Sequence, residues 1–403
     1  MTTPSRFDAV IVGGFGHVGL PLGLVFADVG LQVGLYDIDR EKRRTIEAGR
    51  MPFIERDAEP LLRRVLGETL HVVDDLAAIG RSEYVVITIG TPVDEYLNPK
   101  VRPVLALADE LVPHLTAGHR IVLRSTVYPG TSKSLSDLLR RRGRDVHVAY
   151  CPERIVQGYA VRELRKLPQI ISGFTPEAVA SSRALFERLG VETLEVSVAE
   201  AELAKLFSNA WRYLQFAAAN QFYMIATDHG VDYARVYEAM TANYGRAQDL
   251  PRPGFAAGPC LLKDTLQLAA AYRNNFLLGH AAMMVNEGLP DFVVRRLVEH
   301  DGIDLNGARV GILGMAFKAD IDDIRDSLSY KLAKILRFHG ATVVCSDEYV
   351  DDPAFVKKED LLASCPIVVV GVPHAAYRGL VVPAATHLVD LWGVTAPPRG
   401  ASA

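Results

Sequence analysis

The chain has 403 residues and a formal net charge of −4, with 49% hydrophobic and 23% charged residues. This composition excludes a disordered chain, and the length predicts two or three domains with cores of their own. No apolar stretch reaches the roughly 18 residues of a membrane span, no signal peptide is recognisable, and the acidic balance gives no electrostatic footprint for nucleic acid. We therefore expect a cytoplasmic protein with neither a membrane nor a nucleic-acid partner.

The first half alternates β-branched runs with amphipathic stretches, which predicts βαβ units around a parallel sheet. A long helix is expected next, at residues 199–229, with more helix after it that is interrupted by a Gly- and Pro-rich stretch at 244–258. The βαβ pattern then restarts, and the tail at 396–403 is expected to be disordered. Strands are predicted at 8–12, 32–36, 84–89, 120–123, 146–149, 309–313, 342–345, 367–371 and 387–391, and a helix at 327–339.

The predicted fold class is therefore α/β with two α/β parts and a helical middle. We place an N-terminal Rossmann domain at residues 1–196, a central long-helix domain at 197–300 and a C-terminal Rossmann-like domain at 301–403.

A dinucleotide fingerprint follows the first predicted strand. Gly14, Gly16 and Gly19 form G-x-G-x-x-G at the start of a helix, where glycines allow the tight turn, the approach of backbone to a pyrophosphate and close helix packing. Asp37 ends the second predicted strand, close to the expected spacing of about 20 residues for an acid that binds a ribose 2′-hydroxyl. Because a carboxylate repels a 2′-phosphate, the pattern predicts NAD rather than NADP.

Cys260 is the cysteine whose surroundings suggest chemistry. It follows a flexible Gly/Ala loop at a predicted helix start, where the helix dipole stabilises a thiolate, and Asp264 lies one turn later on the same face. On these local features a structural cysteine remains an alternative. The other three cysteines are predicted to be core residues, and no cysteine–histidine cluster indicates a metal site; they are Cys151, Cys345 and Cys365.

A polar stripe accompanies the apolar face of the long helix. Glu202, Lys205 and Asn209 fall at positions i, i+3 and i+7. A solvated helix face is one interpretation, and a lysine and an amide that donate to a developing oxyanion are the other.

Taken together, the motifs resemble the UDP-glucose/GDP-mannose dehydrogenase family over nearly the whole chain. The family's blocks occur in order: the glycine fingerprint ending Gly19-Leu20-Pro21-Leu22, then Thr91-Pro92-Val93-Asp94, Ser125-Thr126-Val127-Tyr128-Pro129-Gly130-Thr131, Pro152-Glu153-Arg154, Glu202-Leu203-Ala204-Lys205 with Asn209, Cys260-Leu261-Leu262-Lys263-Asp264, Gly314-Met315-Ala316-Phe317-Lys318 and Asp323-Ile324-Arg325-Asp326-Ser327.

This resemblance implies a homodimeric enzyme that oxidises the C6 alcohol of a UDP-sugar to a carboxylate with two NAD, through a cysteine thiohemiacetal and thioester. It implies catalytic roles for Cys260 as nucleophile, Lys205 and Asn209 as oxyanion donors, Asp264 in water and proton steps, and Thr126 and Glu153 near the catalytic water. The implied NAD contacts are Gly14, Gly16, His17, Val18, Gly19, Asp37, Thr91, Ser125, Lys263 and Arg325. The implied contacts to the nucleotide sugar are Glu153, Arg154, Lys205, Asn209, Phe255, Phe317 and Lys318.

Two features give opposite indications for the sugar. The Lys263-Asp264 pair is similar to UDP-glucose enzymes, whereas the Pro152-Glu153-Arg154 block is closer to members that act on N-acetylhexosamines. We expect UDP-glucose, with UDP-N-acetylglucosamine or UDP-N-acetylmannosamine as the alternative. Ala257 and Gln221 depart from the family pattern without an evident consequence. A two-electron β-hydroxyacid dehydrogenase and a non-catalytic NAD sensor remain further alternatives.

Overall fold

The computed structural model describes residues 4–94 and 100–395, so the predicted disordered tail lies outside the described residues. The chain forms two compact units, Met1–Ser208 and Asn209–Ala403, which are described separately below. Within the described ranges, no helix is both long enough and apolar enough to cross a membrane.

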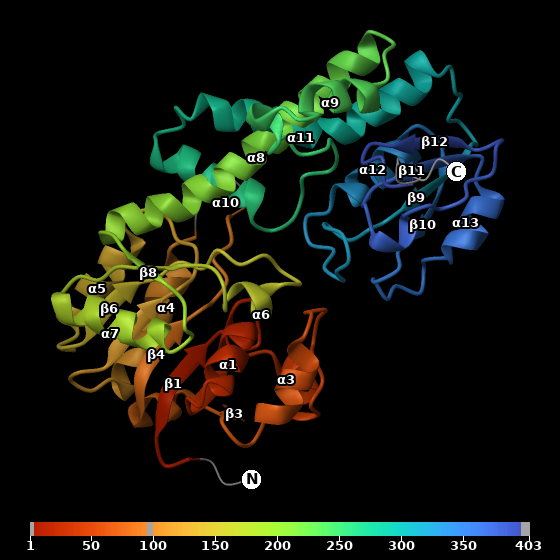
Figure 1. The fold of residues 1–403 in the computed structure, drawn as a ribbon. Coiled ribbons are helices and arrows are strands. Elements are labelled where there is room, and N and C mark those ends of the chain that lie inside the picture. The colour runs from red at the N-terminus through yellow and green to blue at the C-terminus, as the bar shows by residue number, and fades with distance from the viewer. Residues whose placement is uncertain (1–3, 95–99, 396–403) are drawn as a thin grey trace. The chain divides into compact units, whose positions relative to one another are not determined.

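Unit 1 is built on a parallel sheet with the strand order β3-β2-β1-β4-β5-β6 (Figure 1). This is the doubly wound order, in which the chain reverses direction between β1 and β4 and leaves a ligand crevice at the carboxyl ends of those strands. The strands are β1 (Phe7–Val12), β2 (Val33–Tyr36), β3 (Leu70–Val72), β4 (Ser82–Ile87), β5 (Arg120–Leu123) and β6 (His147–Tyr150).

Apolar side chains on the two faces of this sheet form two separate core clusters, one around Ile11 and Val86 and the other around Val10 and Val85. Adjacent strand residues point to opposite faces, and helices cover both, so the strands are nearly continuous in apolar residues. The helices are α1 (Gly19–Asp28), α2 (Arg40–Glu47), α3 (Ala58–Val65), α4 (Arg102–Leu111), α5 (Thr131–Arg141), α6 (Ala160–Glu163) and α7 (Pro176–Glu187), and a small parallel sheet joins β7 (Gln169–Ile171) to β8 (Thr193–Glu195).

Helix α8 (Val198–Asp228) runs for 31 residues and carries the boundary between the units. At 1.5 Å per residue it is about 46 Å long. Its apolar positions recur at helical spacing, and the side chains of Leu206, Ala210, Tyr213 and Ala217 are buried. The sequence-based prediction of a helix at 199–229 is correct to one residue at each end.

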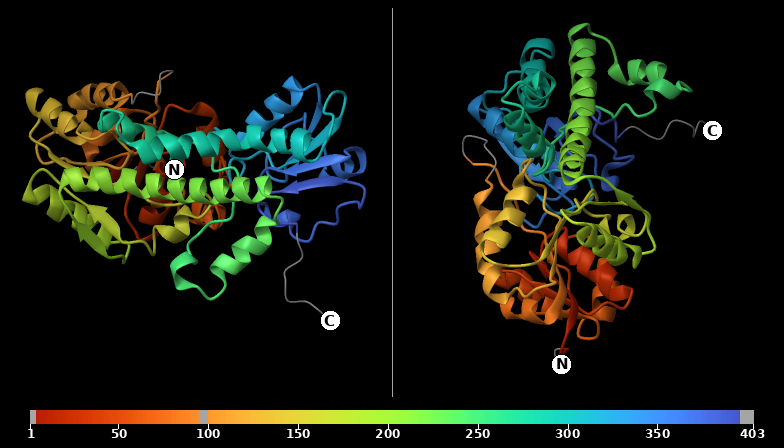
Figure 2. Two further views of the ribbon diagram at one scale, coloured as in Figure 1. Left: turned by 90° about the horizontal axis from the view of Figure 1, so that it is seen from above. Right: turned by 90° about the vertical axis from the view of Figure 1, so that its left-hand side faces the viewer.

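Unit 2 joins the second part of α8 to α9 (Tyr233–Thr241), α10 (Leu261–Ala271) and α11 (Leu277–Arg295). Both views of Figure 2 show α8 and α11 running alongside each other, and Tyr213 and Ala282 pack in one apolar cluster between them. A second parallel sheet has the order β10-β9-β11-β12, with its own reversal between β9 and β11. Its elements are β9 (Arg309–Leu313), α12 (Leu328–Phe338), β10 (Thr342–Ser346), α13 (Lys358–Ser364), β11 (Ile367–Val370) and β12 (His387–Asp390).

The fold class predicted from the sequence is confirmed: two doubly wound parallel sheets and a helical middle. The structure also contains β3, β7 and β8, which we did not predict, because three-residue strands are too short for a periodic pattern to emerge. The predicted domain boundaries at 196/197 and 300/301 stay a prediction.

Candidate functional site

The glycine loop after β1 has the geometry that a dinucleotide requires. A Cβ atom on Gly19 would lie 2.4 Å from the carbonyl oxygen of Gly13, and one on Gly14 would lie 2.9 Å from that of Ile11, so neither position admits a side chain. A Cβ on Gly16 would meet only one atom, at 3.5 Å, so the space beside it is open to a ligand. Helix α1 begins at Gly19 without a side-chain cap, which leaves its positive end to bind a phosphate.

Asp37 follows β2 beside this loop. Its Oδ2 atom accepts a hydrogen bond from the Phe15 N–H at 3.1 Å, and its Oδ1 atom accepts one from the Asp39 N–H at 3.2 Å. The carboxylate is half-buried and already lies against the fingerprint loop, where an NAD ribose would be held. His17, in the same loop, packs against Phe53 with ring centroids 4.0 Å apart and the ring planes tilted by 43°.

Thr91 and Ser125 join the loops that leave β4 and β5. The Thr91 hydroxyl donates to the Thr126 carbonyl, and the Ser125 hydroxyl donates to the Ile89 carbonyl at 2.7 Å. These predicted cofactor and water-site residues therefore lie together at the carboxyl edge of the sheet.

Glu153 lies at the same edge and is almost fully buried, with 6% of the residue exposed. Its Oε2 atom pairs with the Arg124 guanidinium, and its Oε1 atom accepts from the N–H groups of Arg154 and Ile155 at 2.7 and 3.1 Å. Because protein groups already engage both oxygens, the arrangement favours a carboxylate that fixes the loop over a free general base. The role of Glu153 near a catalytic water stays a prediction.

Arg124 is the residue here that the sequence analysis missed. It directly follows β5, it is 1% exposed, and its guanidinium stacks on Phe186 at 4.7 Å and donates to Gln169 at 3.1 Å. The sequence did contain a signal for it: Arg124 is a charged residue directly after an apolar strand and directly before the Ser125 block.

The polar stripe of α8 is not a solvated face. Glu202 is 3% exposed, and its two oxygens accept from the N–H groups of Gly130 and Ser132, at 2.7 and 3.0 Å, at the start of α5. Lys205 is 8% exposed, and no carboxylate among the described residues lies within ion-pairing distance of it. Its positive charge is therefore open to pairing with an anionic ligand.

In unit 2 the predicted residues gather around the start of α10. Asp264 is 1% exposed; its Oδ2 atom accepts from the Asn209 amide at 2.5 Å, and its Oδ1 atom lies 2.7 Å from the Lys263 ammonium. Cys260 is exposed and occupies the N-cap position of α10, so the predicted helix start is confirmed. The other three cysteines are buried, as predicted.

Arg325 lies near this thiol. It forms a forked pair with Asp323, whose hydrogen bond is the main cause that raises the pKa of Arg325; the negative charge of a Cys260 thiolate also raises it. A cation that a thiolate stabilises also stabilises the thiolate, so this contact suits a nucleophilic cysteine.

Phe317 packs against the loop that leads to Cys260, because a Cβ on Gly258 would lie 2.4 Å from its ring. Phe317 and Lys318 are half-buried in the loop that follows β9, the edge at which open parallel sheets bind ligands. Phe255, by contrast, is 4% exposed within the apolar core of unit 2. Its contact with a nucleotide sugar stays a prediction.

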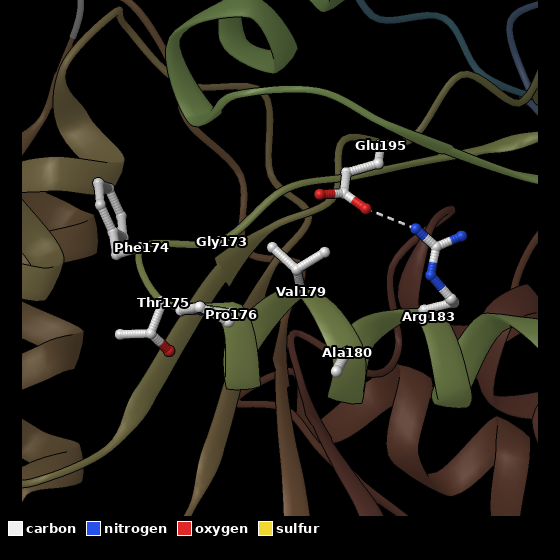
Figure 3. A pocket seen from close by; sticks show the side chains of 8 residues that line it. All are labelled: Gly173, Phe174, Thr175, Pro176, Val179, Ala180, Arg183 and Glu195. Atoms are coloured by element: carbon white, nitrogen blue, oxygen red, sulfur yellow. Dashed lines mark hydrogen bonds and ion pairs between the residues drawn. The ribbon is translucent and has the colours of Figure 1, made fainter.

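A separate hollow of about 450 Å³ lies beside the start of α7 (Figure 3). The ion pair between Arg183 and Glu195, at 2.6 Å, closes one side of it, and none of the predicted site residues lines it. The hollow therefore gives no indication of a reaction. Within the described ranges, no cluster of three or more histidine, cysteine or acidic residues could hold a metal ion.

Models of the UDP-glucose/GDP-mannose dehydrogenase family match most of the chain. The NAD binding domain matches residues 8–190, the central domain residues 199–288 and the UDP binding domain residues 311–397. The chain is similar to a UDP-N-acetyl-D-mannosamine dehydrogenase from Pyrococcus horikoshii, with 29% identity over 92% of this chain and 90% of that protein. It is similar to a UDP-N-acetyl-D-glucosamine 6-dehydrogenase from Pseudomonas aeruginosa, with 28% identity over 93% and 89%. The structure of a UDP-glucose dehydrogenase from Pyrobaculum islandicum has a TM-score of 0.88, with 28% identity over 97% and 95%.

The position of Asp37 generates a test of cofactor binding. Asp37→Ala should weaken NAD binding by about 1–3 kcal/mol, because a hydrogen bond to a charged group is lost. Calorimetric titration measures the dissociation constant. Asp39→Ala is the matched control: it removes the cap of α2, where Asp39 accepts from Glu41 and Lys42, and should leave NAD affinity unchanged. Equal affinity of the wild-type protein for NAD and NADP would contradict the assignment.

Proposed function

Because the chain belongs to the UDP-glucose/GDP-mannose dehydrogenase family, we propose that it oxidises the C6 alcohol of a UDP-N-acetylhexosamine to a carboxylate. The observation that carries the proposal is Cys260, exposed at the start of α10, with Asp264 held one turn later by Asn209 and Lys263. The matches to the family's NAD binding domain and UDP binding domain support NAD as the cofactor and a UDP-sugar as the substrate.

The reaction removes four electrons from the sugar as two hydrides, and each hydride is accepted by one NAD. The first oxidation gives an aldehyde, and the Cys260 thiolate adds to its carbonyl carbon to form a thiohemiacetal. The second oxidation gives a thioester, and water breaks its C–S bond, which releases the acid and regenerates the thiol. Each sugar thus consumes one water and two NAD and yields two NADH and three protons.

Different polar side chains serve different steps of this reaction. Lys205 is largely buried, and no carboxylate among the described residues pairs with it, so it supplies positive charge for the alkoxide-like states, while the Asn209 amide adds a donor. Asp264 stays close to Lys263 and Asn209, so its carboxylate serves as the acceptor for a proton from the water that attacks the thioester. This assignment rests on the resemblance of these positions to the family's catalytic set.

The names of similar proteins and the Pro152-Glu153-Arg154 block support an N-acetylhexosamine over glucose, which reverses the preference expected from the sequence. UDP-glucose is the second candidate, supported by the Lys263-Asp264 pair and by the similar fold of a protein named UDP-glucose dehydrogenase.

We also propose that the enzyme is a homodimer built on α8. Four large apolar side chains on this helix are exposed, and they recur every three to four residues or a multiple of that spacing, so they share a face. They are Phe207, Trp211, Phe222 and Ile225, with exposed fractions of 53, 61, 41 and 48%.

A substrate panel tests the proposed activity. UDP-N-acetylmannosamine, UDP-N-acetylglucosamine, UDP-glucose and GDP-mannose are each supplied with NAD, and NADH is counted against sugar consumed. We expect two NADH per molecule of a UDP-N-acetylhexosamine. One NADH per sugar would indicate a two-electron dehydrogenase, none would indicate a sensor, and turnover of GDP-mannose alone would contradict the UDP-sugar assignment.

Cys260→Ser tests the covalent step. An alcohol is far less acidic than a thiol, whose usual pKa is about 8.5, so the variant should lose steady-state turnover and give at most a slow, sub-stoichiometric NADH signal. Binding of NAD and UDP-sugar should survive. Cys365→Ala, which changes a buried cysteine, is the control and should lower stability more than turnover. Two NADH per sugar at the wild-type rate from Cys260→Ser would disprove the thioester route.

The dimer is tested by sedimentation equilibrium. Trp211→Glu places a charge on the exposed face of α8 and should halve the measured mass, because burying an unpaired carboxylate opposes association. Val381→Glu is the control, since Val381 is an exposed apolar residue remote in sequence from α8. A monomeric wild-type protein would contradict the proposal.

A further inference from the structure

The segment that leads to Cys260 has no regular secondary structure of its own. Residues 251–259 form neither helix nor strand, yet Gly254, Phe255 and Ala256 within it are buried. Buried backbone N–H and C=O groups need hydrogen-bond partners, and in a loop those partners must come from side chains or from other loops. The position of Cys260 therefore depends on what holds this segment.

Asn220 of α8 holds it with a pair of hydrogen bonds. The Gly254 N–H donates to Asn220 Oδ1 at 2.7 Å, and Asn220 Nδ2 donates to the Gly254 carbonyl at 3.1 Å. A side-chain amide carries the same donor and acceptor as a peptide group, so the pair resembles one rung of a β-ladder. Asn220 is 0% exposed.

A second buried amide extends the network away from the loop. Asn220 Nδ2 also donates to Asn286 Oδ1 at 2.9 Å, and Asn286 Nδ2 donates to the Tyr213 carbonyl at 3.0 Å. The two bonds to Gly254 by themselves determine which end of the Asn220 amide carries the oxygen, because only Oδ1 can accept from the Gly254 N–H. The network links α8, α11 and the loop.

Aromatic rings close the loop from the other side. A Cβ on Gly254 would lie 2.2 Å from the ring of Trp392, and Trp392 Nε1 donates to the Gly371 carbonyl at 3.1 Å. Phe317 packs equally closely on Gly258. The loop thus has little freedom to move away from Asn220.

The spacing on α8 connects this contact to the site. Asn209 and Asn220 are eleven residues apart, which is about three turns, so both amides lie on one face of the helix, about 16 Å apart along its axis. Asn209 holds Asp264 after the cysteine, and Asn220 holds Gly254 before it. Helix α8 therefore forms hydrogen bonds to the segment both before and after Cys260.

We propose that Asn220 is a positioning residue for the reaction: by pairing with the Gly254 backbone it sets the place of the Cys260 thiol relative to Asp264. The inference rests on the proposed function, in which Cys260 is the nucleophile. Because Asn220 is fully buried, it acts on the reaction in this proposal through the loop alone. Its loss should slow the chemical steps and leave binding of both ligands nearly unchanged.

The test compares Asn220→Ala with Asn286→Ala. Both remove a fully buried amide, but only the first removes the bonds to Gly254. Hydrogen–deuterium exchange of a peptide spanning residues 251–260 reports on the loop, and steady-state kinetics report on positioning. Asn220→Ala should raise exchange in this peptide and lower kcat about tenfold, with each KM within about threefold of wild type. Asn286→Ala should lower the thermal midpoint but leave the exchange of this peptide and kcat near wild type.

Three results would overturn the proposal: unchanged exchange in Asn220→Ala, increased exchange with an unchanged kcat, or an equal loss of kcat in Asn286→Ala. If Asn220→Ala does not fold, Asn220→Ser, which keeps a hydroxyl in the site, is judged by the same criteria. Failure of the proposed function is recognised separately. Full turnover by Cys260→Ser would show that Cys260 is not the nucleophile, whereas the hydrogen–deuterium exchange measured for Asn220→Ala would not be affected by that result.

Discussion

The loops at the carboxyl ends of the parallel strands depend on one constraint, which is that their buried N–H groups must find acceptors outside regular secondary structure. Buried and half-buried carboxylates satisfy it repeatedly. Asp37 accepts from the glycine loop after β1, Glu202 from the start of α5, and Glu153 from its own loop after β6. Ionised carboxylates make strong hydrogen bonds to backbone N–H groups, so each one fixes a loop that would otherwise be mobile.

In the second sheet a carboxylate again accepts hydrogen bonds from loop N–H groups, and here a histidine also donates to it. Asp347 follows β10 and accepts from the N–H groups of Met315 and Ala316 at 2.6 and 2.9 Å and from His374 at 3.1 Å. Burial raises the pKa of Asp347, but His374 and the loop amides outweigh it and hold the pKa below its ordinary value. His374 Nδ1 in turn accepts from the Asp320 N–H, so its Nε2 carries the proton. The loop with Phe317 and Lys318 is thus held from both ends by Asp347 and His374.

The sequence was sufficient for the parts that periodicity and spacing determine. The doubly wound sheets, the length of α8, the glycine loop and the position of Cys260 at a helix start all follow from local patterns. The partners of buried polar groups did not follow, because Arg124 meets Glu153 across 29 residues and Asn220 meets Gly254 across 34. No local pattern distinguishes a solvated glutamate from one that caps a distant helix, as Glu202 does. Contacts of this kind require the tertiary structure.

Buried charged groups differ in whether protein groups already pair with them, and this distinguishes residues that hold the fold from a residue that is available to a ligand. Glu153 and Glu202 are buried, and protein donors engage both oxygens of each. Such groups are stable in the resting enzyme and gain little from a substrate. Lys205 differs, because its side chain is largely buried and no carboxylate among the described residues pairs with it. In the proposed reaction an oxyanion forms beside this unpaired charge, and such an interaction is stronger in the transition state than in the ground state. A differential of that kind accelerates a reaction, whereas a satisfied ion pair at the same position would not.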